Sequence, residues 1–214
     1  MAEENRYTFT VRQATEADWP GVIDALTSAF EHDPVMNNVM GGDGKSQKVR
    51  DLFGFQIRHT YGPKGTIDVA VTEEGKILGA ALWISPEGQK GGLMDEIRAL
   101  PEYAKVLGAG LLRAAIVDLK LLAARPKFPH WLLYTIGVHE DARGHSIGSH
   151  LLDFRRFQLG ELPAYLEAST YRSAKLYAQH GFVELFRFKS GKPVLGMLHP
   201  APVTQVSKNN PAGR

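Results

Sequence analysis

The sequence predicts a single α/β domain in which helices lie on the faces of a mixed sheet. Three observations predict this class: an early two-strand hairpin, an apolar strand that runs directly into a polar turn and a helix, and a closing order of strand, helix, strand, strand. The chain has 214 residues, 43% of them hydrophobic and 22% charged, which is enough to bury a full core without disulfides.

The first half of the chain predicts strands and helices from local signals. Thr15, Asp18 and Pro20 are start signals for a helix whose apolar face reaches Phe30. The turn at 73–76 joins two runs of strand type. The expected elements are a strand at 7–12, helices up to residue 30 and at 47–61, strands at 67–72 and 77–84, and two helices across 94–124 that part near 108–110.

The second half carries the stronger pattern. Residues 131–138 (WLLYTIGV) form a continuous apolar run of strand length, which is typical of a buried strand. A polar turn at 139–145 follows, and a helix with an apolar stripe starts near Ile147. The further expected elements are a strand at 163–168, a helix at 172–180 closed by Gly181, and strands at 182–188 and 193–199. In such a fold a ligand binds at the carboxyl ends of the central strands.

Composition narrows the function classes. Lys and Arg total 25 and Asp and Glu 23, a net charge of +2, which disfavours a nucleic-acid partner. There is no Cys, and hence no thiolate nucleophile or thiolate metal site. The polar start of the chain and the charges within 103–124 predict a cytoplasmic protein with no membrane partner. We expect a flexible tail at 1–6, one domain at 7–200 and a disordered tail at 201–214.

The segment from Val138 to Leu151 carries the chemistry. A buried strand enters a turn that contains Arg143 and Gly144, and a helix with Gly148 in its first turn follows. Backbone N–H groups at a helix N-terminus attract anions, so this arrangement fits a phosphate. The alternative to a phosphate site is that Gly144 and Gly148 only allow the backbone to turn. The P-loop and the dinucleotide glycine patterns are both absent.

With its neighbours, this segment resembles the GNAT superfamily of N-acetyltransferases, and within it puromycin N-acetyltransferase and its relatives. The likeness to the superfamily rests on Val138, the loop 143–148, the strand sequence 166–169 (LEAS) and the run 176–182 (LYAQHGF). The likeness to the subgroup rests on the sequences 125–127 (RPK), 135–138 (TIGV), 166–169 (LEAS), 11–15 (VRQAT) and 29–30 (AF). It implies a mostly antiparallel twisted sheet flanked by helices, and acetyl-CoA as co-substrate without a metal. Two positions depart from the family pattern: Ser146 stands in place of Gly, where it could cap the helix and bind phosphate, and Ser173 stands in place of Asn.

The resemblance also implies the residues that contact acetyl-CoA. The strand would bind the pantetheine arm through the amides of Ile136 and Val138, and the loop would hold the pyrophosphate. The expected contacts are Ile136, Gly137, Val138, Arg143, Gly144, His145, Ser146, Ile147, Gly148, Ser149, Ser173 and Tyr177.

Two residues are expected to act in catalysis. Tyr177 is similar in position to the family's proton donor to the leaving thiolate, although a core tyrosine is the alternative. Glu167 lies in a buried strand beside the expected cleft, where it would act as a base, orient the amine, or serve only the structure. Together with Glu167, Phe30 and His32 are the expected substrate contacts.

These observations favour an enzyme that acetylates a primary amine of a small molecule, such as an aminonucleoside or another antibiotic, by direct transfer. The alternatives are a protein or peptide N-acetyltransferase and a non-catalytic acyl-CoA-binding module. The histidines at 139, 145 and 150 lack the spacing of a metal site. We expect a monomer or a homodimer.

Overall fold

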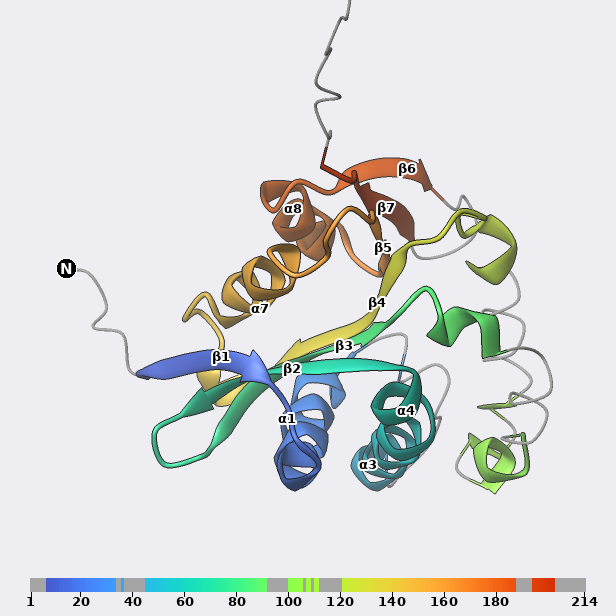
Figure 1. Ribbon diagram of the computed structural model, residues 1–214. Helices are drawn as coiled ribbons and strands as arrows, with labels where there is room; N and C mark the ends of the chain where they lie inside the picture. The colour runs from blue at the N-terminus through green and yellow to red at the C-terminus, as the bar shows by residue number, and fades with distance from the viewer. Residues whose placement is uncertain are drawn as a thin grey trace, which may run out of the picture.

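The computed structural model describes residues 7–33, 36, 45–91, 100–105, 107–108, 110–111, 121–187 and 194–202. Its centre is a seven-stranded sheet in the order β1-β2-β3-β4-β5-β7-β6, in which the β4–β5 pair is parallel and every other pair antiparallel (Figure 1). The strands are β1 Phe9–Gln13, β2 Gly65–Thr72, β3 Ile77–Ile84, β4 Trp131–Val138, β5 Ala164–Ala168, β6 Val183–Arg187 and β7 Leu195–His199.

The helices form one layer on each face of this sheet (Figure 1). On one face lie α1 (Trp19–Phe30), α3 (Lys45–Gln56), the π-helical turn η2 (Ile57–Tyr61) and α4 (Gly62–Lys64). On the other face lie α7 (Ile147–Arg156) and α8 (Tyr171–Gln179). Short 3-10 turns are η1 (Glu16–Asp18), η3 (Gly88–Gly91) and η4 (Glu140–Ala142).

Each face of the sheet has its own hydrophobic core. The core below α1 and α3 includes Val22, Leu26, Phe53, Val69 and Leu82. The core below α7 and α8 includes Leu78, Trp83, Leu151, Leu166 and Tyr177. The side chains of β2 and β3 alternate between the two cores, which explains why β3 is a nearly continuous apolar run.

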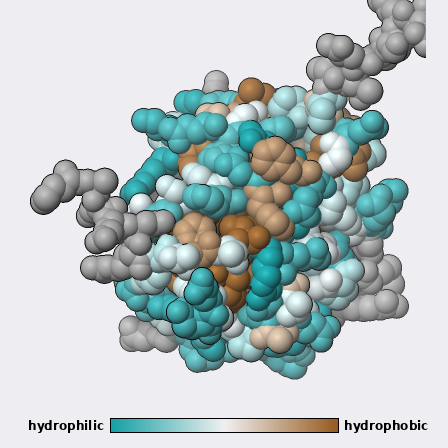
Figure 2. All heavy atoms as spheres, turned by 60° about the vertical axis from the view of Figure 1, so that its left-hand side comes forward, coloured by the Kyte–Doolittle hydropathy of each residue, from teal (hydrophilic) through white to brown (hydrophobic). Residues whose placement is uncertain are grey.

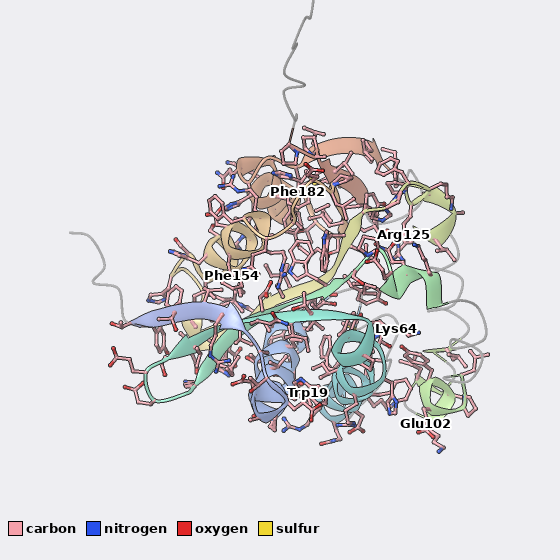
Figure 3. The ribbon with its side chains drawn as sticks, viewed as in Figure 1. Trp19, Lys64, Glu102, Arg125, Phe154 and Phe182 are labelled. Atoms are coloured by element: carbon pink, nitrogen blue, oxygen red, sulfur yellow. The ribbon has the colours of Figure 1, made fainter. Side chains whose placement is uncertain are left out.

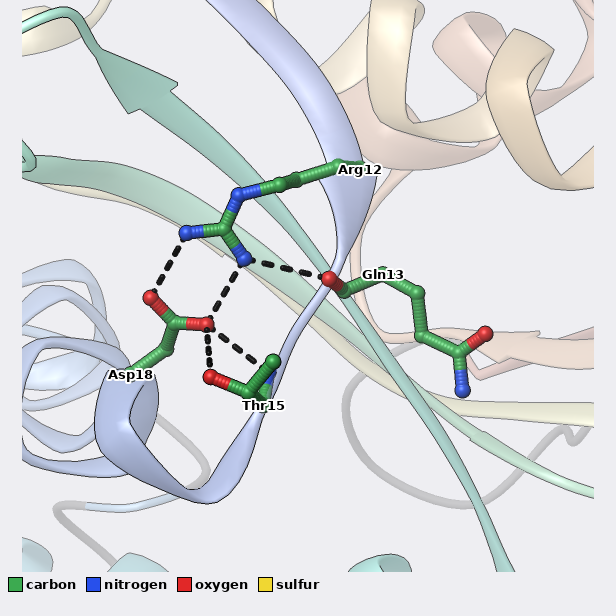
Figure 4. Close-up of polar contacts among 4 residues, drawn as sticks. All are labelled: Arg12, Gln13, Thr15 and Asp18. Atoms are coloured by element: carbon green, nitrogen blue, oxygen red, sulfur yellow. Dashed lines mark hydrogen bonds and ion pairs between the residues drawn. The ribbon is translucent and has the colours of Figure 1, made fainter.

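The start of the first helix is fixed by a small polar cluster (Figure 4). The amide and the hydroxyl of Thr15 both donate to one carboxylate oxygen of Asp18, at 2.7 and 2.9 Å. Arg12 of β1 donates to both oxygens of the same carboxylate, at 2.7 and 2.8 Å, and holds the pKa of Asp18 below its usual range. The predicted start signals therefore tie β1 to the helical segment that leads into α1.

The expected fold class and order of elements are confirmed. The strand expected at 131–138 has those bounds, and the closing strand pair is present as β6 and β7. Of the two helices expected across 94–124, helical residues are described at 100–105, 107, 110–111 and 121–124, and the remainder lies outside the described part. The tail at 1–6 and residues 203–214 also lie outside it, so the proposed domain limits stay predictions. No helix among the described residues is long and apolar enough to cross a membrane.

A buried ion pair fastens α7 to the sheet. Arg155 of α7 binds both carboxylate oxygens of Asp68 on β2 and donates to the hydroxyl of Thr66 at 3.2 Å. The side chains of Arg155 and Asp68 are 5% and 0% exposed. The guanidinium also lies 5.6 Å from the ring centre of Trp131. The position of α7, and of the loop before it, therefore depends on a contact between residues far apart in sequence.

Candidate functional site

The sheet is open between β4 and β5. These two strands pair at only three positions, the last being Leu133 with Leu166. Beyond that point β4 stays paired with β3 as far as Val138, and β5 stays paired with β7 as far as Ala168. The carboxyl ends of the two strands therefore diverge, and Tyr134 and Glu167 are the first residues on each side of the opening.

A bulge and the strand alternation decide which backbone groups face this opening. The register of β3 with β4 shifts where Trp83 pairs with Leu133 and Leu82 with Thr135, so that Tyr134 is the bulged residue.

Past the bulge, the backbone N–H of His139 donates to the carbonyl oxygen of Leu78 at 2.8 Å. Alternate residues of an antiparallel ladder direct their N–H and C=O groups to opposite edges of the strand. The backbone of Gly137 therefore faces β3, whereas that of Ile136 and Val138 faces the opening.

The loop after β4 leads to the N-terminus of α7. Gly144 and Ser146 have φ values of +87° and +59°, which turn the backbone sharply before the helix. The first helical hydrogen bond runs from the amide of His150 to the carbonyl of Ser146. Among the described residues no backbone bond is formed by the preceding amides of Ile147, Gly148 and Ser149, as is usual for the first turn.

Three elements meet at this helix start. A Cβ at Gly148 would lie 3.6 Å from the side chain of Leu176 on α8 and 4.0 Å from that of Val138 on β4. The end of β4, the first turn of α7 and α8 therefore pack against one another at Gly148. Figure 2 shows the side of the molecule on which β4 ends, with a hydrophobic area enclosed by hydrophilic residues.

The charged and aromatic groups of the loop are oriented by neighbouring segments. Arg143 is exposed and donates to the carbonyl of Ala29 at the end of α1, at 3.0 Å. The Nδ1 atom of His145 lies 3.1 Å from the carbonyl oxygen of Arg143, and its ring meets Tyr7 edge-on at 5.3 Å. The loop is therefore held between α1 and the start of β1.

The two serines that depart from the family pattern have different surroundings. Ser146 precedes the first residue of α7, but its side chain forms no capping bond, because the left-handed backbone does not have the extended shape of a normal N-cap. The expectation that Ser146 caps the helix is thus wrong. The hydroxyl of Ser173 donates to the carbonyl of Thr170 at 2.9 Å, and the Ser173 amide donates to the Thr170 hydroxyl at 3.0 Å. Ser173 therefore takes part in capping α8.

Tyr177 lies on α8, in the core between this helix and the sheet. It is 8% exposed and belongs to the core that Ile136 and Val138 also contact. Its ring lies 6.0 Å from that of Phe182, in a tilted arrangement. Burial raises the pKa of Tyr177 to about 12, so the phenol keeps its proton at neutral pH.

Glu167 lies on the opposite face of β5 and is ion-paired. Arg125 donates from Nε to one carboxylate oxygen at 2.7 Å and from a terminal nitrogen to the other at 3.0 Å. The side chains of Arg125 and Glu167 are 15% and 10% exposed. Figure 3 labels Arg125 in the segment that leads into β4. Sequence reasoning missed this partner, and the only signal for it was an arginine just before a buried strand.

The other expected site residues lie at or near the α1 face of the sheet, and not all of them reach the opening. Phe30, at the end of α1, lies against β4, where a Cβ at Gly137 would meet its ring at 3.1 Å. Gly137 is buried below α1 and faces β3 with its backbone, so the structure does not bring it to the opening. His32 is exposed in the turn after α1. Within the described ranges there is no group of three His, Asp or Glu side chains able to hold a metal ion.

The comparisons with known proteins agree with this arrangement. Residues 110–184 match the model of the acetyltransferase (GNAT) domain. A structure from Corynebacterium glutamicum ATCC 13032, named as histone acetyltransferase HPA2 and related acetyltransferase, is 37% identical, covers 93% of this chain and 99% of its own, and has a TM-score of 0.74.

More distant structures share the fold. An N-acetyltransferase from Staphylococcus aureus Mu50 is 19% identical over 88% of this chain and 99% of its own, with a TM-score of 0.61. A Drosophila melanogaster polyamine N-acetyltransferase is 14% identical over 89% of this chain and 99% of its own, with a TM-score of 0.53. The seven-stranded sheet, the family match and the 37% identity over nearly the whole chain lead to one conclusion: the protein belongs to the GNAT acetyltransferases, a family of enzymes whose domains use acetyl-CoA.

Proposed function

We propose that this chain transfers the acetyl group of acetyl-CoA to a primary amine of a small molecule, directly and within a ternary complex. The observation that carries the proposal is the opening between β4 and β5. There a strand edge with outward-facing backbone groups meets a helix N-terminus with unbonded amides, and α8, which carries Tyr177, packs beside them.

Acetyl-CoA would bind along one side of this opening. Its pantetheine arm would pair with the backbone of Ile136 and Val138, as an added strand does at a sheet edge. The amides of Ile147, Gly148 and Ser149 and the Arg143 guanidinium would bind the pyrophosphate. An amide of the β4 edge would also hold the thioester oxygen as negative charge develops on it.

Tyr177 would act as the proton donor. Direct transfer needs no nucleophile from the protein, since the amine itself attacks the thioester carbon. The departing CoA sulfur then needs a proton, and a phenol that stays protonated at neutral pH supplies one. Tyr177 belongs to the core against which Ile136 and Val138 also pack, which supports this role.

The acceptor would approach from the face of the sheet that carries Glu167. The Glu167 carboxylate would accept a hydrogen bond from the amine and orient it. Because this side chain is only 10% exposed, a slender amine fits the site better than a bulky surface. Among small amines, aminonucleosides of the puromycin type are the first class to test, because the sequence resembles that subgroup.

A protein or peptide acceptor is the second candidate. The name of the 37% identical Corynebacterium glutamicum protein, histone acetyltransferase HPA2 and related acetyltransferase, favours it. An acceptor panel separates the two: an aminonucleoside, an arylalkylamine, agmatine and a histone-tail peptide, each assayed by release of the CoA thiol. Turnover of the peptide alone would overturn the small-molecule proposal.

Calorimetric titration with acetyl-CoA, with CoA as control, tests the co-substrate site. We expect micromolar binding by the wild type and a loss on the order of 10-fold in Arg143→Ala, because a cation beside the phosphates is removed. Arg156→Ala is the matched control, since Arg156 lies at the far end of α7 and is exposed. Equal affinities of the two variants would overturn the placement of the pyrophosphate.

A further inference from the structure

Tyr134 of the central strand β4 is exposed, although the residues beside it are buried. Its exposed fraction is 37%, whereas Leu133 and Thr135 are 3% and 8% exposed. β4 is the middle strand of the sheet, and a layer of helices lies on each face of that sheet (Figure 1). Side chains of such a strand are normally covered. The layer over Tyr134 therefore leaves part of its ring uncovered.

The Tyr134 side chain lies on the face of the sheet that carries Glu167. Leu133 and Leu166 are paired across β4 and β5, and both belong to the core below α7 and α8. Side chains alternate along a strand, so the next residues, Tyr134 and Glu167, lie on the opposite face. The ring of Tyr134 lies 5.5 Å from that of Tyr61 in η2, which is on that face. Tyr134 and Glu167 therefore flank the opening from its two sides.

The position of the Tyr134 ring is fixed by the strand and by a neighbouring ring. Tyr134 is the bulged residue of β4, and a bulge redirects the side chain that it carries. The Tyr61 ring is 1% exposed and meets the Tyr134 ring at an interplanar angle of 48°. The buried ring thus supports the exposed one, which offers an aromatic surface at the opening.

Aromatic rings also flank Glu167 on its own side of the opening. Tyr165 precedes Glu167 by two residues and so shares its face of β5. On β7 the residue opposite Glu167 is Gly196, and a Cβ there would lie 2.3 Å from the ring of Phe186. The rings of Tyr165 and Phe186 lie 6.4 Å apart. An amine held by Glu167 would therefore have aromatic rings on both sides.

We infer that the acceptor carries an aromatic ring close to its primary amine, and that Tyr134 is the residue that selects this ring. The inference rests on the proposed function, because it takes the opening as the place where the amine binds. Aromatic rings pair offset or edge to face, with centroids about 4.5–7 Å apart, and the exposed part of Tyr134 is available for such a pair. Neighbouring strands lie about 4.8 Å apart, and β4 and β5 separate only after the preceding pair. The ring and the nitrogen of the acceptor are therefore joined by a spacer of about one to three carbon atoms.

Phenethylamine and cyclohexylethylamine test this inference, because they have the same spacer and differ in the aromaticity of the ring. Each amine is titrated calorimetrically into the protein loaded with CoA, which occupies the co-substrate site and has no acetyl group to transfer. The cyclohexyl ring has the larger apolar surface, so burial alone favours it. An aromatic pair favours phenethylamine, which we expect to bind about 2- to 10-fold more tightly to the wild type. Equal affinities, tighter binding of cyclohexylethylamine, or binding of neither amine would overturn the inference.

Variants of Tyr134 identify the residue responsible. Tyr134→Leu should abolish the preference for phenethylamine, whereas Tyr134→Phe keeps the ring and should keep the preference. Phe157→Leu is the matched control, because Phe157 is an 80% exposed aromatic residue that follows α7. Unchanged affinity for CoA in Tyr134→Leu shows that this variant is folded. If Tyr134→Leu prefers phenethylamine as strongly as Phe157→Leu does, Tyr134 does not select the ring and the inference is wrong.

The proposed function is tested separately, by release of the CoA thiol with acetyl-CoA as donor. Binding of phenethylamine that depends on the Tyr134 ring, without thiol release, supports the inference and overturns the acetylation of small amines. Thiol release from both amines with equal kcat/KM and equal affinity supports the proposed function and overturns the inference.

Discussion

The buried pair of Arg155 with Asp68 allows the sharpest test of how α7 is held. We change Arg155 to Met, which keeps much of the aliphatic volume between α7 and the sheet but removes the cation. Asp68 is 0% exposed, so its carboxylate is left in the interior without its main partner. The hydroxyl of Thr66 also loses its donor, since Arg155 bonds to it at 3.2 Å.

The expected cost follows from this burial. Removing one member of a buried ion pair costs about 3–5 kcal/mol, because the remaining charge stays unsolvated. At roughly 2–4 °C per kcal/mol for a chain of this size, the melting temperature should fall by about 6–20 °C. Arg156→Met is the matched control: Arg156 is 40% exposed and lies 3.4 Å from Asp153, so its loss should cost less than about 1 kcal/mol.

The loss of stability in Arg155→Met should also depend on pH. Burial raises the pKa of Asp68, and Arg155 acts in the opposite direction. Without Arg155 the folded-state pKa rises further above the unfolded value. A carboxyl group whose pKa is higher in the folded than in the unfolded state destabilises the fold increasingly as the pH rises toward the folded-state pKa. The loss of stability in Arg155→Met should therefore be larger at pH 8 than at pH 5.

Urea unfolding at both pH values measures this directly. The double variant Asp68→Asn/Arg155→Met should recover part of the loss, because it buries no charge. If Arg155→Met is no less stable than Arg156→Met, or its deficit is the same at pH 5 and pH 8, the ion pair does not hold α7 on the sheet.

Three further sets of substitutions test the site. Tyr177→Phe should lower kcat about 10²–10⁴-fold while calorimetry shows unchanged acetyl-CoA affinity, and an unchanged kcat would rule Tyr177 out as the acid. Ser146→Gly should stabilise the protein by up to about 1 kcal/mol in thermal unfolding, because glycine adopts the φ of +59° at this position more easily than serine does. Ser149→Gly, inside α7, is the control and should destabilise the protein by a similar amount, because glycine disfavours a helix interior. A Cβ at Gly137 would lie 2.8 Å from the side chain of Ala29, so Gly137→Ala should lower the free energy of unfolding by about 1–3 kcal/mol. A Cβ at Gly148 would have ordinary room, with its nearest neighbour at 3.6 Å. Gly148→Ala should therefore leave stability unchanged and act on the KM for acetyl-CoA. Equal stability of the two glycine variants would contradict the close packing of α1 on β4.

The elements themselves were predictable, because their signals are local. The apolar run of β4, the turn residues after it and the glycine that follows α8 each fix structure within a few neighbouring residues. The unbonded amides at the start of α7 follow from helix geometry alone. This is why the loop 143–148 could be proposed as an anion site from the sequence, whereas Tyr177 was proposed as the acid through the resemblance to the family.

The pairings between distant residues were not predictable in the same way. Glu167 and Arg125 are 42 positions apart, and Asp68 and Arg155 are 87 apart. A charged residue in an apolar strand indicates that some partner is needed, but no sequence spacing identifies it. The proposed role of Glu167 therefore depends on Arg125, which donates to both of its carboxylate oxygens.

The opening itself is the feature that local signals could least specify. β4 is paired along β3 as far as Val138, and β5 is paired along all five of its residues with β7, while only three pairs join the two half-sheets. Each half-sheet satisfies its own backbone on one side, so each strand can leave the other at Leu133 and Leu166. The unpaired edge of β4 then lies beside the first turn of α7, whose amides form no backbone bond, and beside α8, which carries Tyr177. The position of the proposed active site thus depends on where the pairing between the two half-sheets ends, at Leu133 and Leu166.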